Sequence, residues 1–192
     1  MALTEPIRDL KQVQALLSYY KNRGETRNHL LIAIALHTAL RISDILQLRV
    51  EDVYDFKSHR VRTQITLTEK KTGKGKIVAL HKNIRKAIKS YLQQNYFSPS
   101  TPLILNSNTG KAISRVHAYR LIATAAKAVG ITQSVSPHSL RKTFGYHAWK
   151  DGISPAIIME IYNHSSLAVT RRYLGVTQSD MNNVYQTLNF AC

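Results

Sequence analysis

The sequence has a single cysteine, Cys192, and only 11 acidic residues among its 192 amino acids. One cysteine excludes a disulfide framework or a cysteine-based zinc site within one chain, and it favours a reducing, intracellular setting. The opening Met-Ala-Leu-Thr-Glu-Pro lacks the basic start and apolar core of a signal peptide, and no apolar run approaches membrane-spanning length. We therefore expect a cytoplasmic protein that has no membrane partner.

The scarcity of acidic residues leaves a large positive charge. Lysine and arginine together number 27, which gives a formal net charge of +16. This charge exceeds what solubility requires and indicates a polyanionic partner, held partly by the release of counterions. A ribosomal protein would carry a similar charge, so composition does not distinguish a binding protein from an enzyme.

Hydrophobic periodicity predicts a mostly helical chain. The run from Leu30 to Leu36 is apolar on nearly all sides, so the helix that contains it should be the central core helix. The expected helices begin after caps at Asp9, Ser43, Asn83, Ser114 and Ser154, and others span about 26–39, 137–150, 167–174 and 179–189.

Between these helices the pattern changes to that of a β-hairpin. From Arg60 to Leu67 apolar and polar residues alternate, which is the period of a half-buried strand. A glycine-rich turn at 72–75 precedes a returning strand at 77–80. The expected fold class is therefore mainly α with a small antiparallel β-sheet (α+β), in a single domain over residues 1–192. The hairpin tip should be an exposed basic finger that carries Lys70, Lys71, Lys74 and Lys76.

Two arginines are candidates for binding a phosphate. His138 and Arg141 lie three residues apart at the start of a predicted helix, so they share a face near the helix N-terminus, which favours anions. The simpler interpretation is a polar first turn with a solvated arginine. Arg41 lies between two apolar stretches and needs an anion or buried acceptors; the alternative is a structural ion pair with Asp44 or Glu51.

The last third of the chain offers a second histidine and a tyrosine. His164 follows Asn163 between two predicted helices, where a capping or turn role is the simpler interpretation. Tyr173 is flanked by Arg171 and Arg172, which favours an exposed position, but the chain has ten tyrosines. Because most tyrosines serve packing, spacing alone does not identify Tyr173 as a nucleophile.

Five segments, taken in order along the chain, resemble the catalytic motifs of the tyrosine recombinase (phage integrase) family. Ala39-Leu40-Arg41-Ile42-Ser43-Asp44-Ile45-Leu46 resembles the first arginine box, and Lys71-Thr72-Gly73-Lys74 resembles the active-site lysine hairpin. His138-Ser139-Leu140-Arg141 resembles the His-x-x-Arg box. Asn163-His164-Ser165-Ser166, with Tyr173 nine residues after His164, resembles the second histidine and the nucleophile. The resemblance covers essentially the whole chain and implies the catalytic-domain fold of that family.

The chain departs from the family pattern at two positions. Ala39 and Asn163 stand where the family usually has glycine. Asparagine tolerates a left-handed backbone almost as glycine does, and Ala39 is expected to add at most a methyl group. Neither change removes a catalytic group, so the resemblance implies an active enzyme.

The resemblance implies a site-specific recombinase that cleaves and rejoins DNA through a 3′-phosphotyrosine intermediate. Tyr173 would attack the scissile phosphate and release a 5′-hydroxyl, which later attacks in another duplex. The bidentate forks of Arg41 and Arg141 would take the place of metal ions at the phosphate. Neither ATP, a metal nor any other cofactor is then required.

The resemblance implies roles for the other motif residues as well. Lys71 would be the general acid for the leaving 5′-oxygen, and His138 would be the general acid/base at the tyrosine. His164 would donate a hydrogen bond to the non-bridging oxygens. The further residues expected to bind DNA are Lys70, Lys74, Lys76, Arg171 and Arg172.

The implied partner is double-stranded DNA, so the protein should be associated with the nucleoid. Recombination in this family runs in a homo-tetramer on DNA, and a monomer in solution without DNA is compatible with this. Family members exchange C-terminal segments, and the amphipathic tail around Met181, Val184 and Leu188 is a candidate; the alternative is packing on its own domain. The N-terminal core-binding domain that family members normally carry is expected to be absent.

Two other functions remain open at this point. A type IB topoisomerase resembles this family in using arginine, lysine, histidine and tyrosine to nick and reseal DNA. The short chain and the His138-Ser139-Leu140-Arg141 box favour the recombinase. A DNA-binding regulator would keep the fold without the chemistry, and the filled catalytic positions argue against it.

Overall fold

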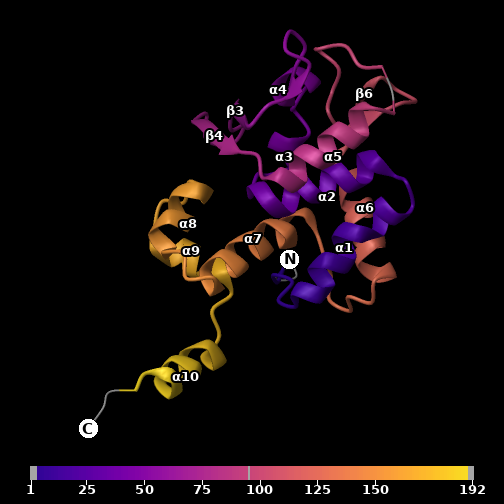
Figure 1. Cartoon of the computed structure of the whole chain (residues 1–192). Helices are drawn as coiled ribbons and strands as arrows, with labels where there is room; N and C mark the ends of the chain where they lie inside the picture. Colours follow the sequence, from indigo (N-terminus) through magenta and orange to yellow (C-terminus); the bar gives the residue numbers. More distant parts are fainter. Residues whose placement is uncertain (1–3, 95, 190–192) are drawn as a thin grey trace.

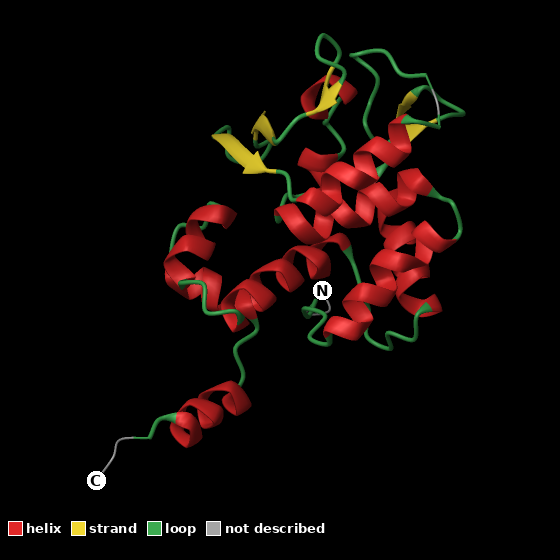
Figure 2. Ribbon diagram, viewed as in Figure 1, coloured by secondary structure: helices red, strands yellow, loops and turns green. Residues whose placement is uncertain are grey.

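The computed structural model describes residues 4–94 and 96–189. This part of the chain is mostly helical, and its strands form three two-stranded antiparallel sheets (Figure 2). The expected mainly α fold is confirmed, with three small hairpins in place of one small sheet. The helices are α1 Leu10–Asn22, α2 Thr26–Thr38, α3 Ile42–Ile45, α4 Val50–Val53, α5 Lys82–Leu92, α6 Arg115–Ala128, α7 Pro137–Lys150, α8 Pro155–Tyr162, α9 Leu167–Leu174 and α10 Gln178–Thr187. The strands are β1 Tyr54–Asp55, β2 Arg60–Val61, β3 Gln64–Thr68, β4 Gly75–Ala79, β5 Leu105–Asn106 and β6 Lys111–Ala112.

Helix α2 lies at the centre of the larger part of the molecule. Its residues from Leu30 to Leu36 are buried, none of them more than 6% exposed. Helices α1, α5 and α7 pack against it, and Figure 1 shows α2 in the middle of this group. The prediction of a central core helix is confirmed, because a helix that is apolar all round needs neighbours on every side.

Two helix starts differ from the sequence-based expectation. Ser43 lies inside α3, and the N-cap is Arg41, where the chain is still extended (φ −70°, ψ 146°). Asn83 lies inside α5, and the N-cap is His81, whose ring accepts from the Asn83 backbone N–H. In both cases the backbone of the preceding loop, which local sequence does not reveal, decides where the helix begins.

The strand expected from Arg60 to Leu67 is divided in two. β2 pairs with β1 and β3 pairs with β4, so the chain changes partner between Val61 and Gln64. Along β3, Ile65 is buried between exposed neighbours, as the alternation predicts. The prediction of an exposed basic tip is confirmed for Lys70, Lys71 and Lys74.

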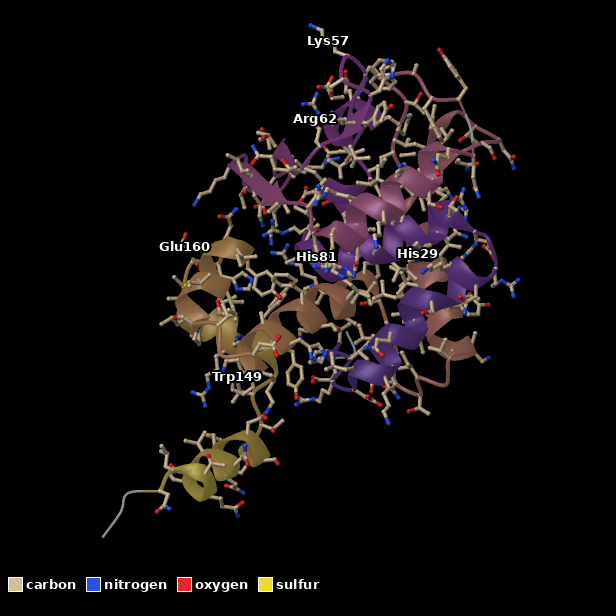
Figure 3. The ribbon with its side chains drawn as sticks, viewed as in Figure 1. His29, Lys57, Arg62, His81, Trp149 and Glu160 are labelled. Atoms are coloured by element: carbon tan, nitrogen blue, oxygen red, sulfur yellow. The ribbon has the colours of Figure 1, made fainter. Side chains whose placement is uncertain are left out.

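Helices α7, α8 and α9 form a second apolar cluster beside the larger part. Its buried members are Ala39, Ile158, Tyr162 and Leu174, and Trp149 near the end of α7 packs against them (Figure 3). Ala39 follows the end of α2, so the cluster is joined directly to the central helix. The expected helices at 137–150, 155–162 and 167–174 are confirmed.

Helix α10 extends away from the rest of the molecule (Figure 1). Its first turn is tied to α7 through Asp180, which lies 3.2 Å from the Lys150 ammonium. The apolar residues Val184 and Tyr185 of α10 are 52% and 80% exposed, and Leu188, directly after the helix, is 59% exposed. The alternative in which this face packs on its own domain is therefore wrong.

No helix in the described residues combines the length and the apolar character that crossing a membrane requires.

Candidate active site

The structure gathers the predicted catalytic side chains around one cleft. The cleft has a volume of about 680 Å³, and Arg41, Lys71, His138 and Arg141 line it. Tyr173 adjoins it through a hydrogen bond to His138, and the His164 ring contacts the Tyr173 ring. The contributing elements are the start of α3, the β3–β4 tip, the first two turns of α7, the α8–α9 turn and α9.

The lining of the cleft is basic. Lys70 and Arg115 also line it, and none of its lining residues is acidic. Such a lining attracts a polyanion. Sequence analysis missed Arg115, which lies in the first turn of α6, where the helix dipole disfavours a cation. That unfavourable position is the signal that would have identified it.

Tyr173 and His138 form the most specific contact of the site. The Tyr173 hydroxyl lies 3.0 Å from His138 Nδ1, and the two rings meet edge to face. Burial raises the pKa of Tyr173, while the positive charges of Arg141 and Arg41 oppose the rise. The packing around the His138 ring lowers its pKa, and the charges of Lys142 and Arg141 lower it further. His138 is therefore neutral near pH 7 and able to accept the phenolic proton.

His164 lies beside the same tyrosine. Its ring centroid is 4.6 Å from that of Tyr173, and its Nδ1 is 3.0 Å from the Thr170 hydroxyl oxygen. Burial, followed by the charges of Arg141 and Arg41, lowers the pKa of His164 to about 4. When Nδ1 accepts from Thr170, the neutral ring carries its proton on Nε2 and can donate it to a substrate oxygen.

Both arginines meet at the C-terminal end of α8. Arg141 donates through Nη2 to the Tyr162 carbonyl at 3.0 Å and through Nη1 to the Ala39 carbonyl. Arg41 Nη2 lies 3.5 Å from the same Tyr162 carbonyl. Arg41 Nη1 forms an ion pair with Glu69 at 2.8 Å, but the alignment is not that of a hydrogen bond. The negative end of the α8 dipole and the Glu69 carboxylate offset the repulsion between the two cations. Arg141 Nε is buried and has no hydrogen-bond partner in the described part of the chain.

The sequence profile of the phage integrase family matches residues 8–180. The chain belongs to this family. The probable integrase/recombinase YoeC of Bacillus subtilis (strain 168) is 34% identical over 186 residues, which are 97% of each chain. Tyrosine recombinase XerC of Thermodesulfovibrio yellowstonii is 28% identical and matches 83% of this chain and 53% of its own. The chain thus spans nearly all of YoeC but about half of XerC.

Solved structures of this family share the fold. The crystal structure of XerA recombinase superposes with a TM-score of 0.78 at 22% identity, over 99% of this chain and 66% of that one. XerH bound to a palindromic difH substrate superposes with a TM-score of 0.75 at 20% identity, over 96% of this chain and 53% of that one. The expected tyrosine recombinase catalytic-domain fold is confirmed.

Family membership also confirms the predicted class of function, a site-specific recombinase of the tyrosine type. The comparisons do not favour the two alternatives, a type IB topoisomerase and a non-catalytic DNA-binding regulator. The roles of individual side chains in this protein stay predictions.

The two departures of this chain from the family glycines both lie at left-handed backbone positions. Ala39 ends α2 with φ 54° and ψ 17°, and Asn163 ends α8 with φ 53° and ψ 43°. Asparagine adopts this conformation readily, as expected. The expectation that Ala39 adds only a methyl group is wrong, because a left-handed backbone costs an alanine roughly 1 kcal/mol. The Ala39 carbonyl accepts from Arg141, which ties the strained turn to the site.

The ion-pair partner of Arg41 differs from both residues that the sequence suggested. Arg41 pairs with Glu69, not with Asp44 or Glu51. Asp44 is 1% exposed, and its carboxylate accepts from the Lys70 backbone N–H at 3.0 Å. Asp44 therefore fastens the hairpin to α3 instead of neutralising Arg41.

Sequence analysis missed Glu69. The residue is 0% exposed, although it directly precedes the exposed lysines of the hairpin tip. Burial by itself would raise its pKa, but hydrogen bonds from Asn163 and Thr72, together with the close contact of the Arg41 guanidinium, lower the pKa to about 2. A single acid at the base of a lysine-rich tip is the signal that would have identified it.

Sequence analysis also missed Tyr162. Its hydroxyl donates to the Arg141 carbonyl at 2.5 Å, and the Arg141 guanidinium carbon lies 4.6 Å from its ring centroid. Gly145 makes room for it, since a Cβ there would lie 2.9 Å from Tyr162 Cε2. A glycine in the middle of a predicted helix, which often marks close packing, is the signal that would have pointed to this contact.

Lys76 does not belong to the exposed tip. Its side chain is 11% exposed, and its ammonium lies 3.5 Å from Glu69 Oε1 and donates to the Ile161 carbonyl. Burial lowers the pKa of Lys76. The expected exposure of Lys76 is wrong because its register in β4, opposite Leu67, turns it inward. The other residues expected to bind DNA, which are Lys70, Lys74, Arg171 and Arg172, are exposed.

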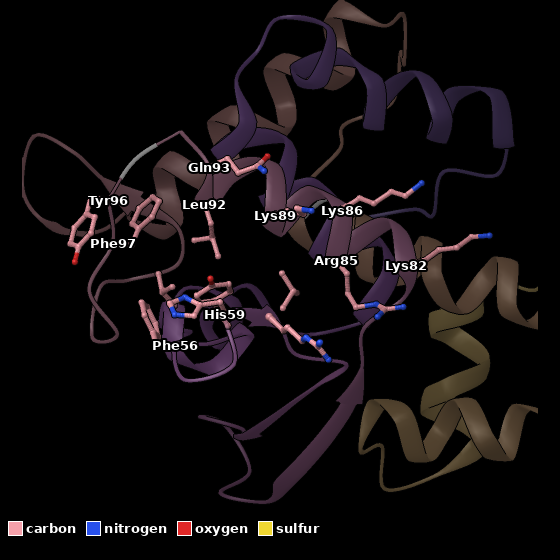
Figure 4. A pocket seen from close by; sticks show the side chains of 14 residues that line it. Phe56, His59, Lys82, Arg85, Lys86, Lys89, Leu92, Gln93, Tyr96 and Phe97 are labelled. Carbon is pink, nitrogen blue, oxygen red and sulfur yellow. The ribbon is translucent and has the colours of Figure 1, made fainter.

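A second, larger groove lies away from these residues. It has a volume of about 800 Å³ and contains none of the predicted site residues. Figure 4 shows Leu92 and Phe97 on one side of it and Phe56 and His59 on the other. Basic residues of α5, among them Arg85, form its rim. The predicted chemistry therefore belongs to the smaller cleft.

Proposed function

We propose that this integrase cleaves and rejoins double-stranded DNA with Tyr173 as the nucleophile, through a 3′-phosphotyrosine intermediate. The contact of 3.0 Å between the Tyr173 hydroxyl and His138 Nδ1 carries the proposal. It places an oxygen nucleophile within hydrogen-bond reach of a neutral base, which is what general-base activation requires. The same histidine then returns the proton when the tyrosine leaves.

The proposed reaction conserves the phosphodiester bond. Tyr173 Oη attacks the phosphorus while its proton passes to His138, and the bond from phosphorus to the 5′-oxygen breaks. Lys71 supplies the proton that the departing 5′-oxygen takes up. A 5′-hydroxyl of another duplex then attacks the phosphotyrosine and frees Tyr173, so the sequence of steps consumes no ATP and needs no metal or other cofactor.

The arginines and His164 stabilise the charge of the transition state. Arg41 keeps 21% of its side chain exposed at the cleft, and Arg141 has an unpaired Nε. His164 adds a third donor when its neutral ring carries the proton on Nε2, beside the Tyr173 ring. Donors that are held in place before the reaction need no rearrangement as charge develops, which makes them more effective than water.

Double-stranded DNA is the proposed substrate. The net charge of +16 and the absence of acidic residues from the lining of the cleft support it. Among similar structures, XerH is bound to difH, the Tn1549 transposon integrase is in complex with circular intermediate DNA, and a lambda integrase dimer is bound to a COC′ core site. We place the protein in the cytoplasm at the nucleoid, with residues 1–192 acting as one catalytic domain. Its DNA backbone contacts would come from Lys70, Lys74, Arg171 and Arg172.

A homo-tetramer on DNA is the proposed assembly, with α10 exchanged between protomers and a monomer in the absence of DNA. The exposed face of Val184, Tyr185 and Leu188 supports the exchange, because an apolar helix face is stabilised by covering it. Sedimentation with and without cognate DNA tests it. A complex that contains one protomer when the DNA is saturated with protein would contradict the tetramer.

A covalent trapping assay tests the nucleophile. The substrate is a pool of duplexes with a randomised centre and a nick that lets the cleaved strand diffuse away, and the adduct is measured on a denaturing gel. Tyr173→Phe should abolish the adduct and keep DNA binding, whereas Tyr119→Phe, a matched change at a 44% exposed tyrosine on α6, should keep both. An adduct with Tyr173→Phe would contradict the proposal. Sequencing the trapped duplexes identifies the target site.

A further inference from the structure

We propose that Glu69 is a positioning residue that holds Arg41, the Lys71 hairpin and the His164 turn in one arrangement, with Asn163 as its partner. The inference rests on the proposed function, because it concerns how the same catalytic side chains are held. Glu69 lies outside the five sequence motifs and does not line the cleft. It would act on the reaction through the residues that it contacts.

The Glu69 carboxylate joins elements that are far apart in the sequence. Its Oε2 lies 2.8 Å from Arg41 Nη1, 2.9 Å from Asn163 Nδ2 and 2.9 Å from the Thr72 hydroxyl. Its Oε1 faces the Lys76 ammonium at 3.5 Å. A carboxylate that is 0% exposed persists in ionised form only where donors and cations surround it. These partners come from the start of α3, the end of α8 and the hairpin itself.

The backbone of Glu69 closes the turn that carries Lys71. Its N–H donates to the Lys74 carbonyl at 2.9 Å, and its carbonyl accepts from the Gly73 N–H at 2.9 Å. Glu69 therefore has its backbone in the lysine hairpin, while its side chain contacts Arg41. The distance between the proposed general acid and the phosphate-binding arginine depends on it directly.

Asn163 connects the same carboxylate to the second histidine. Glycine would also adopt the left-handed turn after α8, but it has no amide to donate to Glu69. Asn163 supplies both the backbone conformation and the hydrogen bond of 2.9 Å, and His164 follows it directly. The departure from glycine at position 163 is therefore coupled to the acidic residue at position 69.

A simpler role for Glu69 is to neutralise the charges of Arg41 and Lys76. A neutralising residue affects folding and the affinity for DNA. A positioning residue also affects the rate at saturating DNA, since misplacing catalytic groups by about 1 Å costs roughly 10²-fold. The rate at saturation distinguishes the two roles.

The test compares Glu69→Gln with Glu160→Gln. Glu160 is exposed on α8 (Figure 3), so its substitution removes the same charge without touching the site. The dissociation constant for the trapped duplex and the rate of adduct formation at saturating duplex are measured for each. Glu69→Gln should lower the rate at saturating duplex about 10²-fold. Its dissociation constant for the duplex should equal that of Glu160→Gln. Equal saturated rates in the two variants, or a loss confined to affinity, would overturn the proposal.

Asn163→Gly tests the partner and keeps the experiment decisive if Glu69→Gln does not fold. Glycine preserves the left-handed turn and removes only the amide. The rate at saturating duplex should fall about tenfold, because the loss of this amide displaces the catalytic groups less than the loss of the Glu69 charge does. The urea midpoint should stay at or above that of the wild type. A wild-type rate would show that the bond to Glu69 does not position His164, and would overturn the coupling.

A third readout separates this inference from the proposed function. If the wild-type protein forms no adduct, the proposed function fails, and ¹⁵N relaxation of the Arg41 Nε–H still tests Glu69. Arg41 should become mobile on the picosecond to nanosecond timescale in Glu69→Gln and stay ordered in Glu160→Gln. An Arg41 that is equally ordered in both variants would overturn the positioning role.

Discussion

Arg141 and Tyr162 hydrogen-bond to each other in both directions. Arg141 Nη2 donates to the Tyr162 carbonyl at 3.0 Å, and the Tyr162 hydroxyl donates to the Arg141 carbonyl at 2.5 Å. Tyr162 is 0% exposed, so no solvent replaces these bonds if one is lost. The packing of α8 on α7 and the position of the Arg141 guanidinium therefore depend on the same pair.

Gly145→Ala should disturb this pair. The new methyl group would overlap the Tyr162 ring, so the free energy of unfolding should fall by about 1–3 kcal/mol, the usual effect of overpacking. Urea unfolding measures it. Gly75→Ala is the matched control, because no atom lies within 4 Å of a Cβ at that position. A wild-type midpoint for Gly145→Ala would contradict the close approach.

Ala39→Gly should stabilise the protein. Glycine removes the cost of the left-handed backbone, so the free energy of unfolding should rise by about 1 kcal/mol. Ala33→Gly, which changes a 2% exposed alanine inside α2, should lower it by at least about 1 kcal/mol, because glycine is unfavourable within a helix. If both variants were destabilised equally, the turn at Ala39 would not be left-handed in solution.

Lys71→Ala should slow cleavage about 10²- to 10⁴-fold, the usual contribution of general acid catalysis. A substrate with sulfur at the 5′-bridging position should restore the rate, since a thiolate leaves without being protonated. Lys74→Ala on the same tip should instead weaken DNA binding. The slope of the logarithm of the binding constant against the logarithm of the salt concentration should become shallower by about 1. Failure of the sulfur substrate to rescue Lys71→Ala would assign Lys71 to DNA binding alone.

Stability should fall as the pH drops below neutrality. The pKa of His164 is lowered from 6.5 to about 4 in the folded protein, so between these values the unfolded chain binds more protons. The contribution of His164 is complete above pH 6.5 and is lost as the pH falls through 4. His29, His37 and His138 have pKa values lowered in the same direction. Urea unfolding at several pH values should show a smaller loss for His164→Gln, and a loss equal to that of the wild type would contradict the shift.

Much of the site could be predicted because its residues stand in motifs that resemble those of the family, and because short-range patterns predict the elements that carry them. The helices at 137–150, 155–162 and 167–174 follow from local periodicity and caps, and they place His138, Arg141, His164 and Tyr173 without any knowledge of the fold. The basic tip follows from turn chemistry in the same way. These features depend on interactions within a few residues, which a sequence displays directly.

The errors occurred where a side chain's surroundings come from elsewhere. The hairpin sequence predicts an exposed Lys76 and gives no role to Glu69 beside it, because it shows neither the register of β4 nor the approach of α8. The sequence suggested Asp44 or Glu51 as the partner of Arg41, but Arg41 pairs with Glu69.

The sequence by itself determined the helices and the basic finger, because these depend on local periodicity and turn chemistry, and its resemblance to the family indicated the motif residues. Only the tertiary structure decided which groups share the site. Glu69 reaches Asn163 across 94 positions, Arg141 reaches Ala39 across 102, and Lys76 turns inward to meet Ile161 across 85. The burial and the hydrogen-bond partners of a charged side chain depend on such distant segments, and they appear only once the chain is packed.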